Sequence, residues 1–323
     1  MGSVPGDPTS TSHAAGTSAL LIRNPVARRR LSDDQLAAIR RIAESAAWRL
    51  EIVATECAGH ATQLARDAAQ RGIDVVIVHG GDGTLNEAIN GLAGTDTAVA
   101  VLRGGTANVW AKETHCAKDP VRSMRAIVSG VRRKVDLGRA GDRYFLLMAG
   151  IGLDAAIVRR VSPGLKRRVG ALAYIVAGAA TALRTRAWRA QIAIDGDASE
   201  RSLYWMVVGN TRSYGGVIDI TYRAHADDGK LDVALMRRGG PLRLVTDLVR
   251  LVRRRLDRSP NVRFGRAASV QIDTPGIPVQ VDGEECGETP LRIDVAPLAL
   301  NVIVPRNLSS PLFTRTDAAN AGR

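Results

Sequence analysis

Residues 80–84 of the sequence read Gly-Gly-Asp-Gly-Thr, which places one carboxylate among three glycines. Glycine allows positive φ angles, and it lets backbone N–H groups approach an anion because no Cβ stands in the way. The loop therefore suits a phosphate group. Asp82 would repel that phosphate unless a cation or a transferable proton accompanies it, such as Mg²⁺ on a nucleotide or a substrate hydroxyl. The pattern indicates phosphoryl chemistry, with a tight strand-to-helix turn as the purely structural alternative.

A second glycine loop follows the first. Residues 101–113 (VLRGGTANVWAKE) run from an apolar strand pattern through two glycines to Thr106 and into a helical pattern. A similar strand pattern precedes the first loop, and Thr84 with Glu87 has the spacing of a capping box, which predicts that a helix starts there. Adjacent strands of a parallel sheet would present both loops to one ligand, together with the free N–H groups of that helix. The chain contains no GxxxxGK[ST] motif, which excludes a P-loop.

The rhythm of the chain divides it into two domains. From residue 19 to about residue 132, short apolar runs alternate with helical patterns, which predicts an α/β domain with a parallel sheet. From about residue 135, strand-like runs are separated by Gly, Pro and Asp turns, and helical patterns interrupt them near 165–187 and 242–257. We expect an α/β domain over residues 18–134, a β-rich domain over residues 135–305, and disordered ends at 1–17 and 306–323.

Composition narrows the possible partners. The formal net charge is +13, and nearly all of the 45 basic residues are arginines. Aromatic residues make up only 4% and do not interleave with basic runs, which argues against nucleic acid as a partner. An anionic membrane surface or a general codon bias towards arginine remain as explanations. Three scattered cysteines indicate a reducing compartment, and the most apolar segment, residues 171–183, is too short to span a bilayer, so we expect a cytoplasmic protein.

The two glycine loops resemble a known family. GGDGTLNEAINGL (80–92) followed by GGTANVWAKE is similar to the catalytic domain of bacterial diacylglycerol kinases, in a superfamily that includes sphingosine and ceramide kinases and is distantly similar to NAD kinases. Further matches follow in the family's order: IRNP (22–25), ATECAGHATQLA (54–65), VDLG (135–138), GIGLDA (150–155), VVGNTRSYGG (207–216), DDGKLDV (227–233) and VDGEE (281–285). The resemblance implies a nucleotide-binding α/β domain with an NAD-kinase-like parallel sheet, a sandwich-like β-rich domain, and an active site in the cleft between them.

The resemblance also implies roles for individual residues. Glu284 would be the general base that takes the proton from a lipid hydroxyl, and Asp82 would lie near the transferring phosphate, as phosphoryl transfer needs positioning, charge neutralisation and one such carboxylate. Because the two acids lie far apart in the sequence, only closure of the domains would bring them together. Without the resemblance, VDGEE reads more simply as an acidic hairpin turn. The residues expected to bind ATP are Asn24, Pro25, Thr55, Gly80, Gly81, Asp82, Gly83, Thr84, Leu85, Asn86 and Thr106.

A structural Mg²⁺ in the second domain is implied in the same way. Its carboxylate ligand would be Asp228, with carbonyl oxygens from His225 and Lys230, and Asp136 would connect it to the active site through water. Hard oxygen donors suit this cation, although HADDGK also fits a plain β-turn. The chain departs from the family where Arg28–Arg30 replace a usual Ser-Gly turn after Asn-Pro, which leaves the role of this basic run open.

We therefore predict an ATP-dependent lipid kinase that most simply converts diacylglycerol to phosphatidic acid. A sphingoid or ceramide-like lipid, phosphatidylglycerol, a soluble acceptor of the NAD-kinase type, or a non-catalytic nucleotide-binding role remain as alternatives. The lipid would be reached by peripheral contact with an anionic membrane surface, and a homodimer is possible. Residues 241–260 would support that contact with one apolar helical face (Val245, Leu248, Val249, Val252 and Leu256), although this face could equally pack on the sheet.

Overall fold

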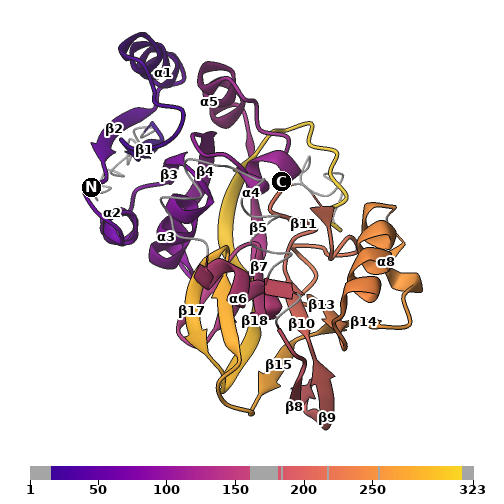
Figure 1. The fold of residues 1–323 in the computed structure, drawn as a ribbon. Helices are drawn as coiled ribbons and strands as arrows, with labels where there is room; N and C mark the ends of the chain where they lie inside the picture. The colour runs from indigo at the N-terminus through magenta and orange to yellow at the C-terminus, as the bar shows by residue number, and fades with distance from the viewer. Residues whose placement is uncertain (1–15, 161–180, 183–184, 217, 254, 315–323) are drawn as a thin grey trace, which may run out of the picture.

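The computed structural model describes residues 16–160, 181–182, 185–216, 218–253 and 255–314 (Figure 1). Most of the helix predicted over 165–187 and nearly all of the predicted disordered lead lie outside these ranges. Within them, every helix falls short of the length and apolarity that crossing a membrane takes.

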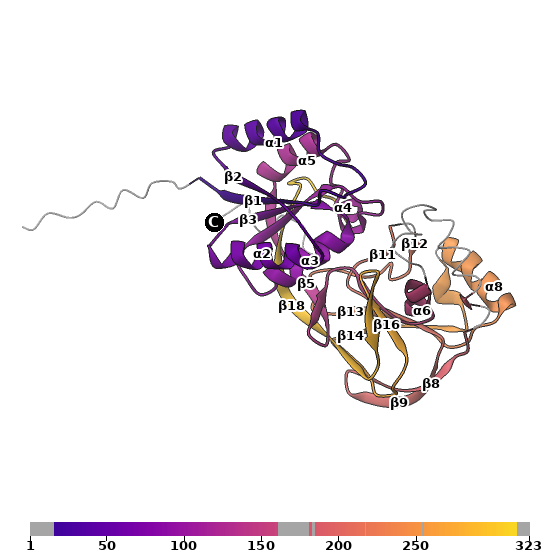
Figure 2. The ribbon, with the colours of Figure 1, turned by 60° about the vertical axis from the view of Figure 1, so that its left-hand side comes forward.

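The first domain is a parallel sheet between two layers of helices, as the alternation of strand and helix patterns predicts. Its strands run in the order β2-β1-β3-β4, and β3 is buried at all six positions. Helices α1 and α5 pack together on one face and α2 and α3 on the other, which Figure 2 shows from the side. The elements are β1 (Ser18–Arg23), α1 (Asp33–Ser45), β2 (Arg49–Ala54), α2 (His60–Gln70), β3 (Val75–Gly80), α3 (Asp82–Leu92), β4 (Ala98–Arg103), α4 (Val109–Glu113) and α5 (Pro120–Val128).

The second domain is a β-sandwich. A six-stranded antiparallel sheet, β14-β13-β10-β7-β16-β17, faces strands β18, β15 and β8 across one apolar core. Its elements are β5 (Val131–Ala140), β6 (Arg143–Phe145), β7 (Met148–Gly152), α6 (Leu153–Arg160), β8 (Trp188–Ile194), β9 (Asp197–Leu203), β10 (Trp205–Gly209), β11 (Ser213–Tyr214), β12 (Ile218–Asp219), β13 (Leu231–Met236), α8 (Pro241–Val252), a 3₁₀ turn (Leu256–Arg258), β14 (Val262–Ala267), β15 (Ser269–Ile272), β16 (Pro278–Val281), β17 (Glu284–Glu288) and β18 (Leu291–Val304).

Strand β18 belongs to both domains. It pairs antiparallel with β15 and β5 in the second domain, and its later residues Asn301 and Val302 pair parallel with β4 in the first. The sheet of the first domain therefore gains a fifth strand from the far end of the chain (Figure 1). Buried Asn301 reinforces the join, since its side-chain N–H group donates to the carbonyl of Thr95 at 3.1 Å.

Helix α8 confirms the helix predicted near 242–257, and Val245 and Val249 of the predicted apolar face lie on one exposed side of it, but Leu256 lies in the 3₁₀ turn beyond the helix and is not part of that face. Leu251 and Leu256 are buried, whereas Val245 and Val249 are 60% and 46% exposed. The helix is held instead by buried Asp247, whose carboxylate accepts hydrogen bonds from the side chains of Ser259 and Asn261. A polar anchor therefore sets the rotation of this helix.

Residues 306–314 correct the prediction of a disordered tail that begins directly after Pro305. Leu312 is fully buried, and its carbonyl accepts a hydrogen bond from the backbone N–H of Ala226. The ring of Phe313 meets Trp110 edge to face at 6.4 Å. These two apolar side chains dock the segment on both domains, which local composition could not reveal.

Candidate active site

The two glycine loops lie in direct contact at the carboxyl ends of β3 and β4. The backbone N–H of Gly104 donates to the carbonyl of Gly80 at 2.9 Å. A Cβ added to Gly105 would lie 2.5 Å from the Cα of Gly81, and one added to Gly80 would lie 2.6 Å from Thr84 Oγ1. The loops are thus glycine-rich because their backbones pack against one another, and together they form one surface.

Helix α3 begins at Asp82, earlier than the predicted capping box allows. Gly81 is its N-cap, with φ −94°, and none of the three glycines of the motif has a positive φ. Thr84 lies within the first turn, where its hydroxyl accepts a hydrogen bond from Asn24 Nδ2 at 3.0 Å. Glu87 instead accepts from the backbone of α2. The predicted capping box is therefore wrong, and the glycines provide room rather than unusual backbone angles.

The residues predicted to bind ATP gather at the carboxyl edge of the parallel sheet, where ligands bind in this architecture. Asn24 follows β1, Thr55 follows β2, and exposed Thr106 follows β4. Leu85 and Asn86, by contrast, are 4% and 2% exposed inside α3. The contact of each of these residues with a nucleotide stays a prediction.

The basic run 28–30 borders the same edge. All three arginines are exposed, and the backbone N–H of Arg29 donates to the carbonyl of Gly104 at 3.0 Å. The segment that departs from the family pattern therefore lies against the second glycine loop. It adds positive charge beside the free N–H groups at the start of α3, where an anion is already favoured.

Asp82 joins the two loops. Its Oδ1 accepts a hydrogen bond from the backbone N–H of Val109 at 2.7 Å, at the start of α4. Burial raises the pKa of Asp82, and N–H donors from Val109 and Asn108 oppose that rise. One oxygen of this carboxylate is thus committed to holding α4 in place.

Glu284 lies against the start of α3, although it belongs to the second domain. A Cβ added to Gly83 would lie 2.9 Å from Glu284 Oε1. Asp282 and Gly283, with φ 49° and 85°, form a tight turn between β16 and β17, so the hairpin reading of VDGEE is also correct. The structure brings Glu284 beside the Gly-Asp-Gly loop without the domain closure that the sequence separation led us to expect.

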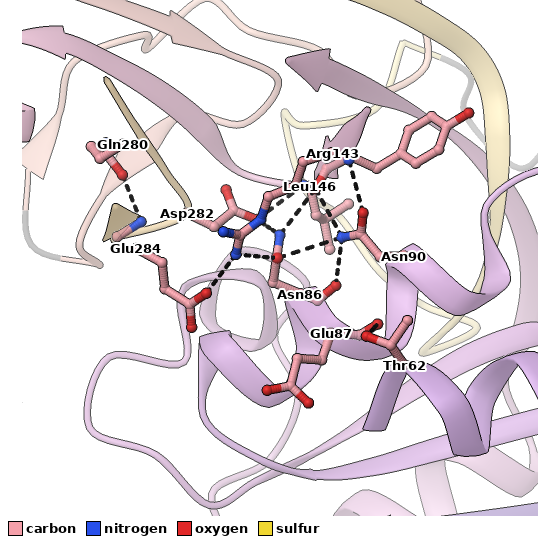
Figure 3. A network of polar contacts seen from close by, with 11 residues as sticks. Thr62, Asn86, Glu87, Asn90, Arg143, Leu146, Gln280, Asp282 and Glu284 are labelled. Atoms are coloured by element: carbon pink, nitrogen blue, oxygen red, sulfur yellow. Dashed lines mark hydrogen bonds and ion pairs between the residues drawn. The ribbon is translucent and has the colours of Figure 1, made fainter. Parts of the chain in front are cut away.

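Arg143 contacts Glu284, and no sequence motif singled it out. Its guanidinium group donates to Glu284 Oε2 at 2.5 Å and to Asn86 Oδ1 at 2.9 Å, so it spans the two domains (Figure 3). The Glu284 side chain is 47% exposed and that of Arg143 is 28% exposed. Only the packing of β6 beside α3 gives Arg143 this position, and no local motif marks it.

Asp282 fixes the turn that carries Glu284. Its carboxylate accepts from three successive backbone N–H groups, Leu146 to Met148. It also accepts from Asn86 Nδ2 at 2.8 Å (Figure 3). Burial raises the pKa of Asp282 to about 6, and these donors oppose the rise. Nearby, Asn90 donates to the carbonyl of Tyr144 at 3.0 Å. Helix α3 is therefore attached to the second domain on the side that faces Glu284.

Helix α4 makes a second attachment between the domains. The carboxylate of Glu113 accepts from the backbone N–H groups of Arg212 and Ser213, at 3.2 and 2.8 Å, and Lys112 Nζ donates to the carbonyl of Gly216. Burial raises the pKa of Glu113, which these donors counteract. The segment VVGNTRSYGG thus holds the end of the second glycine loop.

Of the residues predicted to hold a structural Mg²⁺, Asp136 contacts the turn that carries Asp228 and Lys230. Asp136 is fully buried, and its carboxylate accepts from the backbone N–H of Gly229 at 2.6 Å, within the turn that carries Asp228. In the described part of the chain, no hydrogen bond reaches the carbonyls of His225 or Lys230. One carboxylate and two free carbonyls are a donor set that suits a hard cation. The guanidinium group of Arg266 pairs with Asp228 and neutralises it from one side.

Comparisons with known proteins agree with this geometry. The family profile described as the diacylglycerol kinase catalytic domain matches residues 18–140, and the YegS C-terminal NAD kinase β-sandwich-like domain matches residues 148–304. A diacylglycerol kinase of Mycobacterium tuberculosis (strain ATCC 25618 / H37Rv) is 32% identical over 80% of this chain and 85% of its own. A YegS-like lipid kinase of Pseudomonas putida is 30% identical over 93% of this chain and 98% of its own. The solved structure of a candidate diacylglycerol kinase from Bacillus anthracis is 25% identical in sequence. It covers 91% of this chain and 99% of its own, and it superimposes with a TM-score of 0.76.

Proposed function

Because the chain belongs to the diacylglycerol kinase catalytic-domain family of ATP-dependent lipid kinases, we propose that it phosphorylates the hydroxyl of diacylglycerol to give phosphatidic acid. The observation that carries the proposal is the position of Glu284 against Gly83, at the start of α3. A general base must reach both the acceptor hydroxyl and the phosphate it attacks. A carboxylate of the second domain beside the phosphate loops of the first meets that requirement.

The chemistry divides between the two domains. The glycine loops and the free N–H groups at the start of α3 hold the phosphates of ATP, helped by the exposed Arg28–Arg30. Glu284 takes the proton from the lipid hydroxyl while the oxygen of that hydroxyl attacks the γ-phosphorus of ATP. The bond from that phosphorus to the bridging oxygen breaks, and ADP leaves with the electron pair. Asp82 keeps the two loops together through its hydrogen bond to Val109.

Arg143 orients the base. It holds Glu284 from one side and Asn86 from the other, so it aims the carboxylate at the start of α3. A guanidinium group at this point also offsets the negative charge that gathers during phosphoryl transfer. We assign it as a positioning residue for Glu284.

A structural Mg²⁺ belongs to the same proposal, held by the Asp228 carboxylate and the carbonyls of His225 and Lys230, with Asp136 behind them. When bound, the cation would neutralise the Asp228 carboxylate and fix the shape of the turn. Arg266 would then share Asp228 with the cation or release it. Chelation followed by re-addition of Mg²⁺ tests this through the melting temperature, which is expected to rise with the metal in the native protein and to stay constant in Asp228→Asn. A rise of the same size in both would count against the site.

Peripheral contact with a membrane follows from the lipid acceptor. Diacylglycerol resides in bilayers, so the enzyme meets it at a membrane surface. Cytoplasmic location and a homodimer also remain predictions, and size-exclusion chromatography with light scattering tests the latter.

The decisive experiment is transfer of labelled phosphate from Mg-ATP to a panel of lipids in mixed micelles. Diacylglycerol, a ceramide, a sphingoid base and phosphatidylglycerol form the panel. Glu284→Gln is expected to reduce transfer by a factor of 100 or more, on the order of the usual loss of a general base. The matched control is Glu285→Gln on the same hairpin, whose carboxylate pairs with Arg159 and is expected to leave transfer unchanged.

The outcomes separate the parts of the proposal. Transfer to another lipid would replace diacylglycerol and keep the kinase. Equal transfer by the Glu284 variant would remove this residue as the base. ATP binding without transfer to any lipid would favour a soluble acceptor or a regulatory role.

A further inference from the structure

Four arginines gather around one pocket of the second domain, away from the proposed active site. The pocket has a volume of about 280 Å³ and is lined by Glu200, Arg201, Ser202, Leu235, Arg237, Arg238 and Arg263. Four guanidinium groups and a single carboxylate give it a local charge of about +3. Guanidinium groups bind phosphate oxygens in pairs of parallel hydrogen bonds, so the lining matches a phosphate group.

The pocket lies where the two sheets of the sandwich meet the surface. Arg201 is on β9 of one sheet, and Arg263 is on β14 of the other, directly opposite Leu235 of β13. Leu235 is buried in the sandwich core, so the lining combines an apolar contact with cationic groups. Arg237 and Arg238 follow the end of β13.

Apart from the carboxylate of Glu200 in the lining, the charge of this pocket is left uncompensated by the protein. Within the ranges that the structure describes, none of the four guanidinium groups forms an ion pair, whereas Arg143, Arg159 and Arg266 elsewhere all do. The Nε of Arg237 is buried and has no hydrogen-bond partner among the described residues. The Nη2 of the same guanidinium group donates to the carbonyl of Pro260 at 2.7 Å, which holds Arg237 at the edge of the pocket.

The segment that carries Arg237 and Arg238 leads into α8, whose outer face is apolar and exposed. This helix begins at Pro241, two glycines after Arg238. Asn261 ties the two together by donating to the Arg238 carbonyl and to Asp247 of α8. Leu242, Val245 and Val249 occupy one face and are 78%, 60% and 46% exposed. Figures 1 and 2 show α8 at the outer side of the second domain, far from α1 and α2. Apolar side chains beside a cationic pocket match the two layers of a membrane surface, acyl chains and phosphates.

We propose that this pocket binds the phosphate of an anionic phospholipid while the outer face of α8 rests in the same membrane. The phosphate meets the four arginines, and Leu242, Val245 and Val249 enter the headgroup boundary. The contact deepens the proposed function, which rests on a lipid acceptor, but it involves a lipid other than the one being phosphorylated. It gives the enzyme a fixed attachment point and leaves the proposed active site free for the acceptor.

Vesicle flotation tests the proposal without any kinase assay. Three kinds of vesicle are compared. One contains phosphatidylcholine alone, and the other two contain phosphatidylglycerol or sulfatide at amounts that give the same negative surface charge. Sulfatide carries a sulfate ester in place of the phosphate. Arg238→Gln with Arg263→Gln removes two charges and no side-chain hydrogen bond found in the described chain. Binding to phosphatidylglycerol vesicles is expected to fall roughly 25-fold, about fivefold for each charge. Arg263→Gln alone, with an expected loss of about fivefold, serves if the pair fails to fold.

The control pair is Arg40→Gln with Arg41→Gln on α1, which removes the same charge from the other domain and is expected to leave binding unchanged. Val245→Ser with Val249→Ser on α8 is expected to weaken binding while the pocket stays intact. Equal losses from the pocket and control pairs, or equal binding to both anionic vesicles, would overturn the proposal in favour of a general charge effect.

A last arm separates a membrane lipid from a soluble phosphate. Glycerol 3-phosphate is titrated calorimetrically without vesicles at constant ionic strength. Pocket-dependent binding of this compound, with no pocket-dependent binding to vesicles, would overturn the lipid assignment. Kinase activity in detergent micelles is expected to survive the pocket substitutions, so failure here is distinct from failure of the proposed function.

Discussion

At the scale of single residues, the absence of a side chain at Gly83 matters as much as the presence of one at Glu284. A Cβ at position 83 would lie 2.9 Å from a carboxylate oxygen that ends a flexible side chain. The protein can therefore accommodate a Cβ at position 83 if the Glu284 side chain moves. That movement would displace the proposed base from the start of α3. Glycine in a helix also lowers stability relative to alanine. Alanine would stabilise the helix, whereas glycine leaves room for Glu284. The presence of glycine indicates that this position favours the reaction over stability.

Gly83→Ala is thus expected to lower kcat about tenfold while raising the free energy of unfolding by up to about 1 kcal/mol. Steady-state kinetics and chemical denaturation of the same preparation measure both. Gly265→Ala is the control, since a Cβ there meets nothing within 4 Å. A parallel fall in activity and stability would contradict the positional argument.

Arg143 offers a second test at this scale. Arg143→Gln leaves Glu284 without its cation, and kcat is expected to fall about 10- to 100-fold with little change in the KM for ATP. Arg143→Lys keeps the charge and is expected to recover part of the loss. If both substitutions instead raise KM alone, Arg143 binds the nucleotide and does not orient the base.

At the scale of elements, α6 begins beside a buried carboxyl group. Asp154 is 2% exposed, and its carboxylate accepts hydrogen bonds from the hydroxyl of Tyr214 and from Gln280 Nε2. Burial raises the pKa of Asp154 from 3.8 to about 6, against the effect of these two donors. The folded protein therefore binds this proton more tightly than the unfolded chain does.

The sign of the pH effect follows from that difference. The contribution of Asp154 to stability is fully present below about pH 4 and is lost as the pH rises through 6, a change of about 3 kcal/mol. Asp154→Asn removes this dependence if its amide nitrogen faces Tyr214 and its oxygen faces Gln280. Urea denaturation from pH 4 to pH 8 is expected to give a smaller fall for the variant than for the native protein. Identical slopes would show that Asp154 does not carry the effect.

The elements also show how far local patterns reach. Strand runs such as 75–80, glycine loops and the hairpin at Asp282 are short-range signals, and the sequence predicted them correctly. The Thr84–Glu87 spacing was misleading because the same pattern fits a helix interior, and only the packing of Gly80 on Thr84 distinguishes the two. The position of Arg143 and the docking of Leu312 depend on pairings between distant segments, which periodicity does not encode.

At the scale of the whole molecule, the two domains are joined by more than a linker. Strand β18 lies in both, α3 is bonded to the Asp282 turn, and α4 is bonded to the segment around Ser213. Two separate family profiles match residues 18–140 and 148–304, so the sequence divides into two domains. The contacts between these domains nevertheless favour their unfolding as one cooperative unit.

We therefore expect a single unfolding transition by calorimetry, with equal calorimetric and van't Hoff enthalpies. A fragment that ends at residue 130 is expected to be largely unfolded by circular dichroism, because it lacks β18 and exposes the edge of β4. Two separate transitions, or a folded fragment, would contradict this view.

The shared strand has a further consequence during synthesis. A ribosome releases the first four strands of the nucleotide-binding sheet long before residues 301 and 302, which complete it. Until then the apolar edge of β4 is open to any other strand, including that of a neighbouring nascent chain. The growing polypeptide must either shield this edge with a chaperone or tolerate a half-built sheet for most of translation. A truncated product would release that open edge into the cell, so for this protein an early stop is expected to yield aggregates rather than a working nucleotide-binding domain.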